Sequence, residues 1–247
     1  MCTGLNVQVS VCVTGLTVYL SDWALVCLIT GLNVYISDCL LVWLCTCLIE
    51  HWFECVRVWM CTGLTVYWSE CVLVWLCSCL TIYWSDIVLF WMCTGLTQNW
   101  SDYVLVWLCM VCLCTGMIIL LWLCTGLNVY WSEYVLVWLS TGLTVYWSDC
   151  VLVCLGTGMT VYYSDCVLVW LFTGMILFWS DFVLVWLCTG MTVFWSEFLL
   201  VWLCTGLNVL WSECVMVLLC TGMTEHCFEY VFVLVRLFIG LCTGLTV

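Results

Sequence analysis

Two matching segments combine a histidine with carboxylates at a spacing that could bind a metal ion. They are residues Glu50–Glu54 (Glu-His-Trp-Phe-Glu) and Glu225–Glu229 (Glu-His-Cys-Phe-Glu). On a helix, the histidine and the later glutamate would share one face, as the ligands of a metal ion do. Single-base changes of a repeated codon series also produce these residues, and nothing in the sequence brings the two segments together. We therefore predict no metal site.

Closely spaced cysteines form a second group of candidate ligands. The segments Cys45–Cys47 and Cys77–Cys79 mimic thiolate pairs, but zinc sites usually have a wider spacing and a second matching half. A glycine codon changed to cysteine by one base accounts for them more simply. If the chain winds into stacked coils, Cys61, Cys77 and Cys93, which are 16 residues apart, would lie close enough for disulfides.

Other chemistry-bearing residues also have simpler interpretations. A serine precedes an acid in most repeats, but a nucleophilic serine needs a base, and His51 and His226 both lie outside the intact Ser-Asp/Glu pairs. Asn99-Trp100-Ser101 fits a glycosylation sequon, a pattern that occurs often by chance. We predict no catalytic residue, no cofactor and no small-molecule ligand, and we do not expect an enzyme.

A 16-residue repeat accounts for nearly the whole chain, and it is itself explained by a shorter DNA repeat. Its typical form is Cys-Thr-Gly-Leu-Thr-Val-Tyr-Trp-Ser-Asp-Cys-Val-Leu-Val-Trp-Leu. One codon choice for these 16 residues is TGTACTGGTCTGACTG twice, followed by TGTACTGGTCTGGCTG. The protein repeat then corresponds to a 16-base unit that is read through all three frames in turn.

Composition agrees with this interpretation. The unmodified unit, TGTACTGGTCTGACTG, contains no CC, AA, CG, AG, CA or GC step, and codons for Pro, Lys, Arg, His, Gln and Ala each need one of them. The chain has no Pro and no Lys, and Ala24 is its only alanine. Departures such as Arg57 in a leucine position need one base change, and hydrophobic positions vary as freely as polar ones. The sequence therefore indicates no specific biochemical function.

Hydrophobicity and charge narrow the classes of protein further. Hydrophobic residues make up 68% and charged residues 7% of the chain, against about 45–50% and about 25% in soluble domains. We expect such a chain, if expressed, to be in a membrane or insoluble, through membrane association or self-association. Two arginines cannot form a phosphate-binding surface, so nucleic acid is not expected as a partner. Its 25 cysteines come from the TGT codon and indicate no redox compartment.

The acidic position shows the register of the repeat along the chain. The acids at this position, from Asp22 to Glu229, are 16 residues apart except between Asp102 and Glu133, which are 31 apart. We divide the chain into a first repeat array, 1–108, a charge-free apolar phase break, 109–123, and a second array, 124–247. Met1–Gln8 has no basic residue, so no targeting segment is predicted there.

Within a repeat, two apolar runs alternate with two turn signals. Leu-Thr-Val-Tyr-Trp and Cys-Val-Leu-Val-Trp-Leu are rich in β-branched and aromatic residues, which favour strands. Ser-Asp/Glu and Cys-Thr-Gly are plausible turns. We predict a β-rich tandem repeat of 16-residue period, either a β-solenoid or a meander of short hairpins. Stacked coils would place the acids in a column, and one apolar strand face would stay exposed.

All-α membrane helices, or no stable fold, are the alternative structures. Acid-free stretches between repeats span 15 residues, about 22 Å as helix, which is shorter than a hydrocarbon core of about 30 Å. Leu105–Leu123, inside the charge-free stretch, is the best spanning candidate.

Three functional hypotheses follow from the sequence. The first is the translation product of a 16-base tandem repeat without a specific biochemical function. The second is an integral membrane protein. The third is an extracellular structural or ice-interacting repeat protein, although the threonines of Thr-Gly-Leu-Thr are three apart, a spacing that breaks strand alternation.

Overall fold

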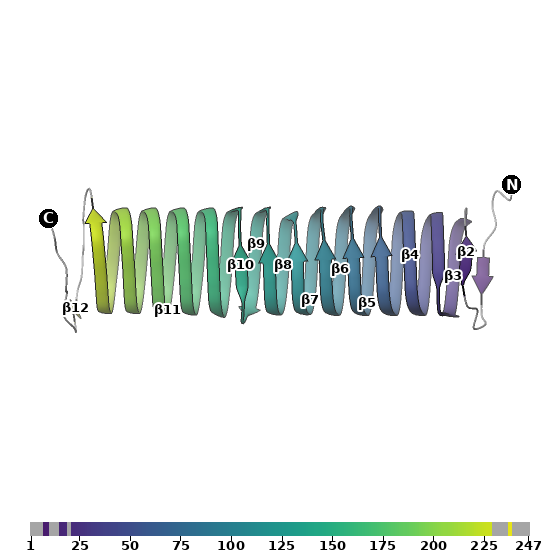
Figure 1. The fold of residues 1–247 in the computed structure, drawn as a ribbon, viewed down its shortest axis with the longest axis horizontal. Coiled ribbons are helices and arrows are strands. Elements are labelled where there is room, and N and C mark those ends of the chain that lie inside the picture. Colours follow the sequence, from purple (N-terminus) through teal and green to yellow (C-terminus); the bar gives the residue numbers. More distant parts are fainter. Residues whose placement is uncertain (1–6, 10–14, 19–20, 229–236, 239–247) are drawn as a thin grey trace. The chain divides into compact units, whose positions relative to one another are not determined.

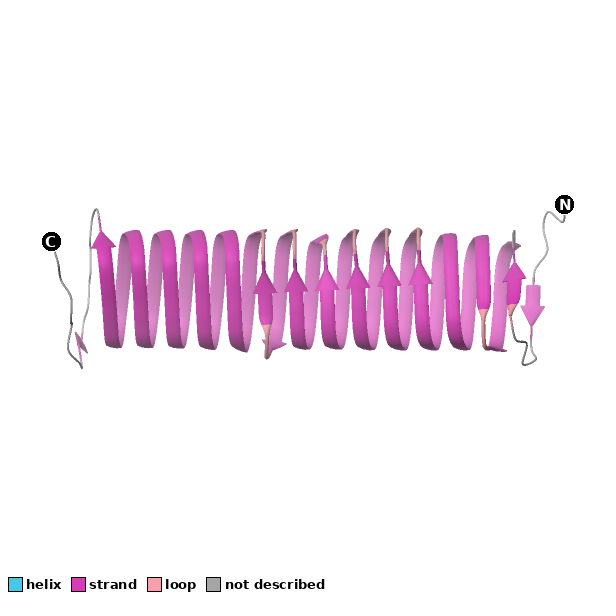
Figure 2. Cartoon of the chain, viewed as in Figure 1, coloured by secondary structure: helices cyan, strands magenta, loops and turns pink. Residues whose placement is uncertain are grey.

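The computed structural model describes residues 7–9, 15–18, 21–228 and 237–238. The chain divides into two compact units, Met1–Leu123 (unit 1) and Cys124–Val247 (unit 2), which are described separately. In the described residues the secondary structure is almost entirely β-strand (Figure 2). None of these residues forms a helix long and apolar enough to cross a membrane.

The strands wind into successive coils within each unit (Figure 1). Unit 1 contains β1 (Val7–Val9), β2 (Leu16–Val18), β3 (Ser21–Ile29), β4 (Leu32–Val66), β5 (Ser69–Ile82), β6 (Ser85–Gln98), β7 (Ser101–Cys114) and the first part of β8 (Gly116–Val129). Unit 2 contains the rest of β8, β9 (Ser132–Ser140), β10 (Leu143–Val145), β11 (Ser148–Phe228) and β12 (Leu237–Phe238). β4 and β11 are longer than one coil because their ladders continue around corners.

Each coil pairs in parallel with its neighbour, and partners along most of the ladder are 16 residues apart. Val56 pairs with Val72 in unit 1. Ser132 pairs with Ser148 in unit 2. The prediction of a β-solenoid is therefore confirmed. A hairpin meander, which needs antiparallel pairs, and the all-α alternative are both wrong for the described residues.

One coil of unit 1, residues 61–76, shows how the sequence divides between core and surface. Six side chains point inward, and they alternate along two strand segments and occupy one position at each corner: Cys61, Leu64, Val66, Ser69, Val72 and Val74. Face A is defined by the outward positions of Thr65 and Tyr67, and face B by those of Cys71, Leu73 and Trp75. The expectation that one apolar strand face stays exposed is met on face B.

Corners form where alternation fails and two successive residues point outward. At one corner Tyr67 and Trp68 bend the chain before the inward Ser69, so this turn begins earlier than the predicted Ser-Glu turn. At the other corner, the predicted Cys-Thr-Gly turn keeps its ladder pairing, and Cys61 pairs with Cys77.

The inward residue at each corner makes the same kind of hydrogen bond. The Ser69 hydroxyl donates to the carbonyl oxygen of Cys71 at 3.1 Å. The Cys61 thiol donates to the carbonyl oxygen of Gly63 at 3.0 Å. A small X–H donor that reaches the carbonyl two residues on is thus common to both corners. Serine and cysteine, which differ by one base in their TCT and TGT codons, both satisfy this requirement.

The phase break is a coil with one residue fewer. Gly116 is the counterpart of Ser101 in the following coil, and a Cβ atom there would lie 2.5 Å from the Ser101 carbonyl oxygen. The Trp107 and Trp122 rings still stack at 5.0 Å, although they are 15 residues apart in the sequence. The missing residue therefore falls at an outward corner and leaves the core columns aligned.

The predicted spanning helix is absent from this part of the chain. Leu105–Leu123 belongs to β7 and β8, where buried and exposed side chains alternate between corners. Parallel ladder bonds of β7 with β6, such as Leu89 with Leu105, satisfy its backbone.

Glycine has different roles at the Cys-Thr-Gly corner in different coils. Gly158, Gly174, Gly190, Gly206 and Gly222 have φ values between 67° and 75°. Cys47 and Cys79 take the same repeat position in unit 1, and no non-glycine residue of the described chain has a positive φ. The unit 1 corner therefore accepts a side chain at Cys47 and Cys79, whereas Gly15 and the later unit 2 corners have a positive φ, a conformation that favours glycine.

Alanine substitutions should separate these two corners. We expect Gly190→Ala to destabilise unit 2 by about 1–2 kcal/mol, because the left-handed backbone disfavours a Cβ. No atom lies within 4 Å of that Cβ, so the cost comes from the backbone alone. The matched control, Gly95→Ala, meets only ordinary contacts from 3.6 Å and should be neutral or stabilising by about 0.4–1 kcal/mol. Denaturant unfolding measures both, and equal losses would contradict the prediction.

In unit 2, two core residues that depart from the typical repeat are complementary in size. Phe172 and Gly156 occupy the inward cysteine position of adjacent coils, and Phe172 is fully buried. A Cβ atom at Gly156 would overlap Cε2 of the Phe172 ring and lie 2.9 Å from its Cζ. The phenylalanine therefore occupies the space that a cysteine at position 156 would need.

A double-mutant cycle should detect this coupling. Gly156→Cys alone should destabilise unit 2 by about 1–3 kcal/mol through overpacking, and Phe172→Cys alone by about 3–5 kcal/mol through the cavity it leaves. The double variant restores the typical repeat, so its loss should be smaller than the two single losses combined by at least about 1 kcal/mol. Additive losses in the free energy of unfolding would show that the two sites are independent.

Candidate functional site

A column of stacked tryptophans on face B is the most extended exposed feature of unit 1. Adjacent rings have centroids 5.0–5.1 Å apart and planes within 5° of parallel. This Trp column consists of Trp43, Trp59, Trp75, Trp91, Trp107 and Trp122. Each ring is 41–54% exposed. Because neighbouring rings cover one another's faces, the column presents ring edges outward and offers little face area for stacking a sugar or a base.

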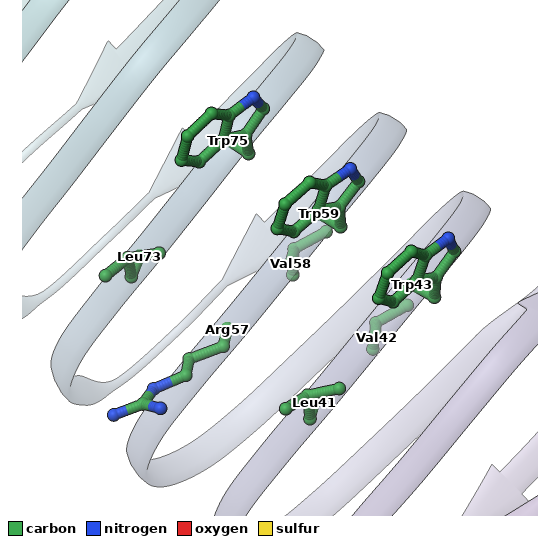
Figure 3. Close-up of a pocket in the computed structure, with 8 residues that line it drawn as sticks. All are labelled: Leu41, Val42, Trp43, Arg57, Val58, Trp59, Leu73 and Trp75. Atoms are coloured by element: carbon green, nitrogen blue, oxygen red, sulfur yellow. The ribbon is translucent and has the colours of Figure 1, made fainter.

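A groove lies beside the Trp column at its N-terminal end (Figure 3). Trp43, Trp59 and Trp75 form one side, and Leu41, Arg57 and Leu73 form the other. Its volume is about 310 Å³ and its lining is almost wholly apolar. Arg57 occupies a leucine position and is the only lysine or arginine among residues 21–228. The groove is suited to an apolar side chain rather than to a polar ligand.

Aromatic columns also occur on face A and at the Tyr-Trp corner. His51 is sandwiched between the Tyr35 and Tyr67 rings at 4.5 and 4.7 Å, with planes within 2° of parallel. In unit 2, Tyr130, Tyr146 and Tyr162 stack at 4.8–4.9 Å. Aromatic pairs contribute about 0.5–1.5 kcal/mol each beyond area burial. These columns therefore stabilise the stacking of coils, and His51 participates as one more flat ring.

The structure separates the residues of the first metal-like segment. Glu50 is fully buried in the core, whereas His51 lies on the opposite side of the strand and Glu54 is exposed. In the second segment, the side chains of Glu225 and His226 and the whole of Glu229 lie outside the described residues. Among the side chains that the structure describes, no three from His, Cys, Asp and Glu are arranged to hold one metal ion.

The remaining candidate pairs also point apart. Cys45 is buried and Cys47 exposed, and Cys77 and Cys79 repeat this arrangement. In each Ser-Asp/Glu pair whose serine is buried, the acid that follows points outward, as in Ser85 and Asp86. The cysteine register expected for stacked coils is confirmed, since Cys61 pairs with Cys77 and Cys77 with Cys93.

Asn99 of the sequon is exposed, whereas Ser101 is fully buried. The hydroxyl of Ser101 is therefore enclosed in the core while the asparagine faces outward.

The burial of two polar side chains was not predicted from the sequence. Glu50 and Gln98 both occupy an inward valine position of the repeat, and neither side chain has a hydrogen-bond partner. Burial, with a smaller contribution from Cys45, raises the pKa of the Glu50 carboxyl well above its ordinary value. Comparison of each residue with those 16 positions before and after it could have identified them, because Val34 and Val66 flank Glu50 in its column.

No protein-family model, curated protein or solved structure matches the chain. The arrangement itself therefore carries the functional argument. The described residues form exposed aromatic columns, an apolar groove and buried thiols.

Replacing Glu50 should stabilise unit 1 in a pH-dependent way. The folded chain keeps the Glu50 proton at pH values where the unfolded chain has lost it. Stability is therefore highest below the ordinary pKa of 4.5 and falls as the pH rises above it. Glu50→Val should then add at least about 1–3 kcal/mol at neutral pH and less in acid.

Gln98→Val is the matched control, since Gln98 is buried and unsatisfied in the same column but does not titrate. Denaturant unfolding between pH 4 and pH 8 should show a constant gain for Gln98→Val and a gain that grows with pH for Glu50→Val. Parallel pH profiles for both variants would count against an uncompensated Glu50 carboxyl.

Proposed function

We propose that the chain is a non-enzymatic structural repeat protein that associates with further copies of itself through face B. The supporting observation is the Trp column, which leaves large aromatic side chains exposed on successive coils of unit 1. Contiguous exposed apolar surface of this kind is typical of interaction sites. The codon pattern is compatible with this proposal, because a repeated DNA unit specifies a stacking element without specifying a reactive site.

A second copy is the partner that the geometry favours. Any other copy presents the same columns at the same coil spacing, about 4.8 Å, so the two surfaces match over several coils at once. The groove beside Trp59 offers a recess for an apolar side chain of the partner. Outward acids such as Glu70 and Asp86 lie next to the serine corner rather than at the centre of face B. Two copies could therefore pack with their acidic columns at the rim.

The threonine columns give less support to an ice-interacting surface. The hydroxyl groups of Thr62 and Thr94 donate to backbone carbonyl oxygens of the preceding coil. A hydroxyl whose proton is already used can only accept from water at such a surface. Membrane association would use the same exposed rings as self-association, so experiment must distinguish between these two.

Sedimentation velocity of the refolded full chain tests self-association. We expect concentration-dependent oligomers of wild type, and at least tenfold weaker association when Trp59, Trp75 and Trp91 are all replaced by Lys. The matched control replaces Trp68, Trp84 and Trp100, which are also exposed but lie at the Tyr-Trp corner. This control should associate as wild type does.

Two results would overturn the proposal. Equal weakening by both triple variants would indicate non-specific apolar collapse. A chain that stays monomeric without lipid, but floats with phosphatidylcholine vesicles until the face B tryptophans are replaced, would indicate a membrane surface instead.

A further inference from the structure

The groove beside the Trp column contains a single positive charge. Arg57 lies in one side of the groove, between Leu41 and Leu73 of the adjacent coils, and the indole rings form the other side (Figure 3). The side chain is exposed, and neither a hydrogen bond nor an ion pair joins it to another residue that the structure describes. Its charge is therefore available to a molecule that enters the groove.

The Arg57 side chain offers a ligand two different kinds of surface. Its aliphatic stem lies among the apolar lining residues, whereas the guanidinium extends along the strand, away from the Trp59 ring (Figure 3). Arginine commonly packs its stem on apolar surface in this way and keeps its charged end in water. A ligand that satisfies both surfaces has an anionic group at the guanidinium and an apolar body beside the rings.

The size and lining of the groove select among anionic amphiphiles. Its volume of about 310 Å³ lies at the lower end of the range for small-molecule pockets, which suits one alkyl chain better than the two chains of a phospholipid. The fork of an arginine matches the two oxygen atoms of a carboxylate. A flexible alkyl chain packs along ring edges, and edges are the part of the indoles that the Trp column leaves uncovered.

We propose that the groove binds the anion of a medium-chain fatty acid, with the carboxylate on Arg57 and the alkyl chain against Trp43, Trp59 and Trp75. Removal of the alkyl chain from water drives binding, and the ion pair fixes the orientation of the ligand. The site does not depend on the proposed self-association, because one copy contains all of its residues.

Nearby acids make this site selective for the coil that contains Arg57. Asp38, Glu54 and Glu70 are exposed at the serine corner of the same coils. Salt screens their repulsion of a bound carboxylate more than it screens the direct contact with Arg57. Where the repeat keeps leucine at this position, as at Leu105, an anion would meet the acids without a compensating cation. A neutral amphiphile has no such preference and should bind alike beside other rings of the Trp column.

Equilibrium dialysis of the refolded full chain against radiolabelled decanoate, below its micelle concentration, tests the site. Arg57→Leu restores the typical residue of the repeat, so this variant should fold as wild type does. We expect it to bind decanoate at least about tenfold more weakly, because the charge-assisted hydrogen bonds are lost. Decanol has the same chain without the charge, and its affinity should change by less than about twofold. Acetate, which has the charge without the chain, should not bind measurably.

Moving the arginine along the column gives a gain-of-function control. The ladder pairs Arg57 with Leu73 and Leu73 with Leu89, so Leu89 occupies the same position two coils further on. Trp91, in the same coil as Leu89, stacks with its neighbours on both sides. The double variant Arg57→Leu, Leu89→Arg should therefore regain decanoate binding to within about threefold of wild type.

Four results would overturn the proposal. These are unchanged decanoate affinity in Arg57→Leu, equal weakening of decanoate and decanol, no recovery in the double variant, and Arg57-dependent binding that is seen only with phosphatidylglycerol vesicles. The last would indicate a lipid surface instead of a free fatty acid. Sedimentation velocity of the same samples separates this site from self-association. Arg57→Leu adds apolar area to face B and should associate at least as strongly as wild type, whatever its affinity for decanoate.

Discussion

Parallel stacking in register is the constraint on which the other features of this chain depend. Each side chain lies about 4.8 Å from its counterpart in the next coil, so every position of the repeat becomes a column of like residues. Stacking identical side chains is favourable for aromatic rings such as Trp59 and Trp75, whose planes are within 1° of parallel. It is unfavourable for outward acids, where adjacent charges repel by roughly 0.9 kcal/mol even in bulk water. The exposure of those acids to solvent keeps this cost small.

Departures from the repeat have local effects, because each coil contacts only its neighbours. Buried Glu50 and Gln98 replace apolar residues in one column, yet Val66 and Ile82 between them are fully buried as usual. Phe172 is accommodated by a glycine in the adjacent coil rather than by a change of fold. A chain that varies freely by point mutation can therefore keep one architecture, provided that each coil still finds partners on both sides.

The fold was predictable from the sequence because period, β-branched residues and aromatic residues all point to stacked strands. The alignment of Cys61, Cys77 and Cys93 followed from the same period. The corners were less predictable, since simple alternation fails where Tyr67 and Trp68 both point outward. The burial of Glu50 and the separation of Cys45 from Cys47 depend on those corners. The difference in backbone φ between Gly190 and Gly95 could not be predicted from the sequence, because both positions are glycine.

The shortened coil between Ser101 and Gly116 shows what sets the register between neighbouring coils. Trp107 and Trp122 stack as closely as rings separated by a full repeat, so the missing residue is absorbed at the corner. Register is therefore set by side-chain columns and not by the count of residues between them. Insertions and deletions at outward corners should accumulate in such a chain more readily than changes at inward positions. Two copies that have diverged in length could then keep superimposable cores while their sequences no longer align residue by residue.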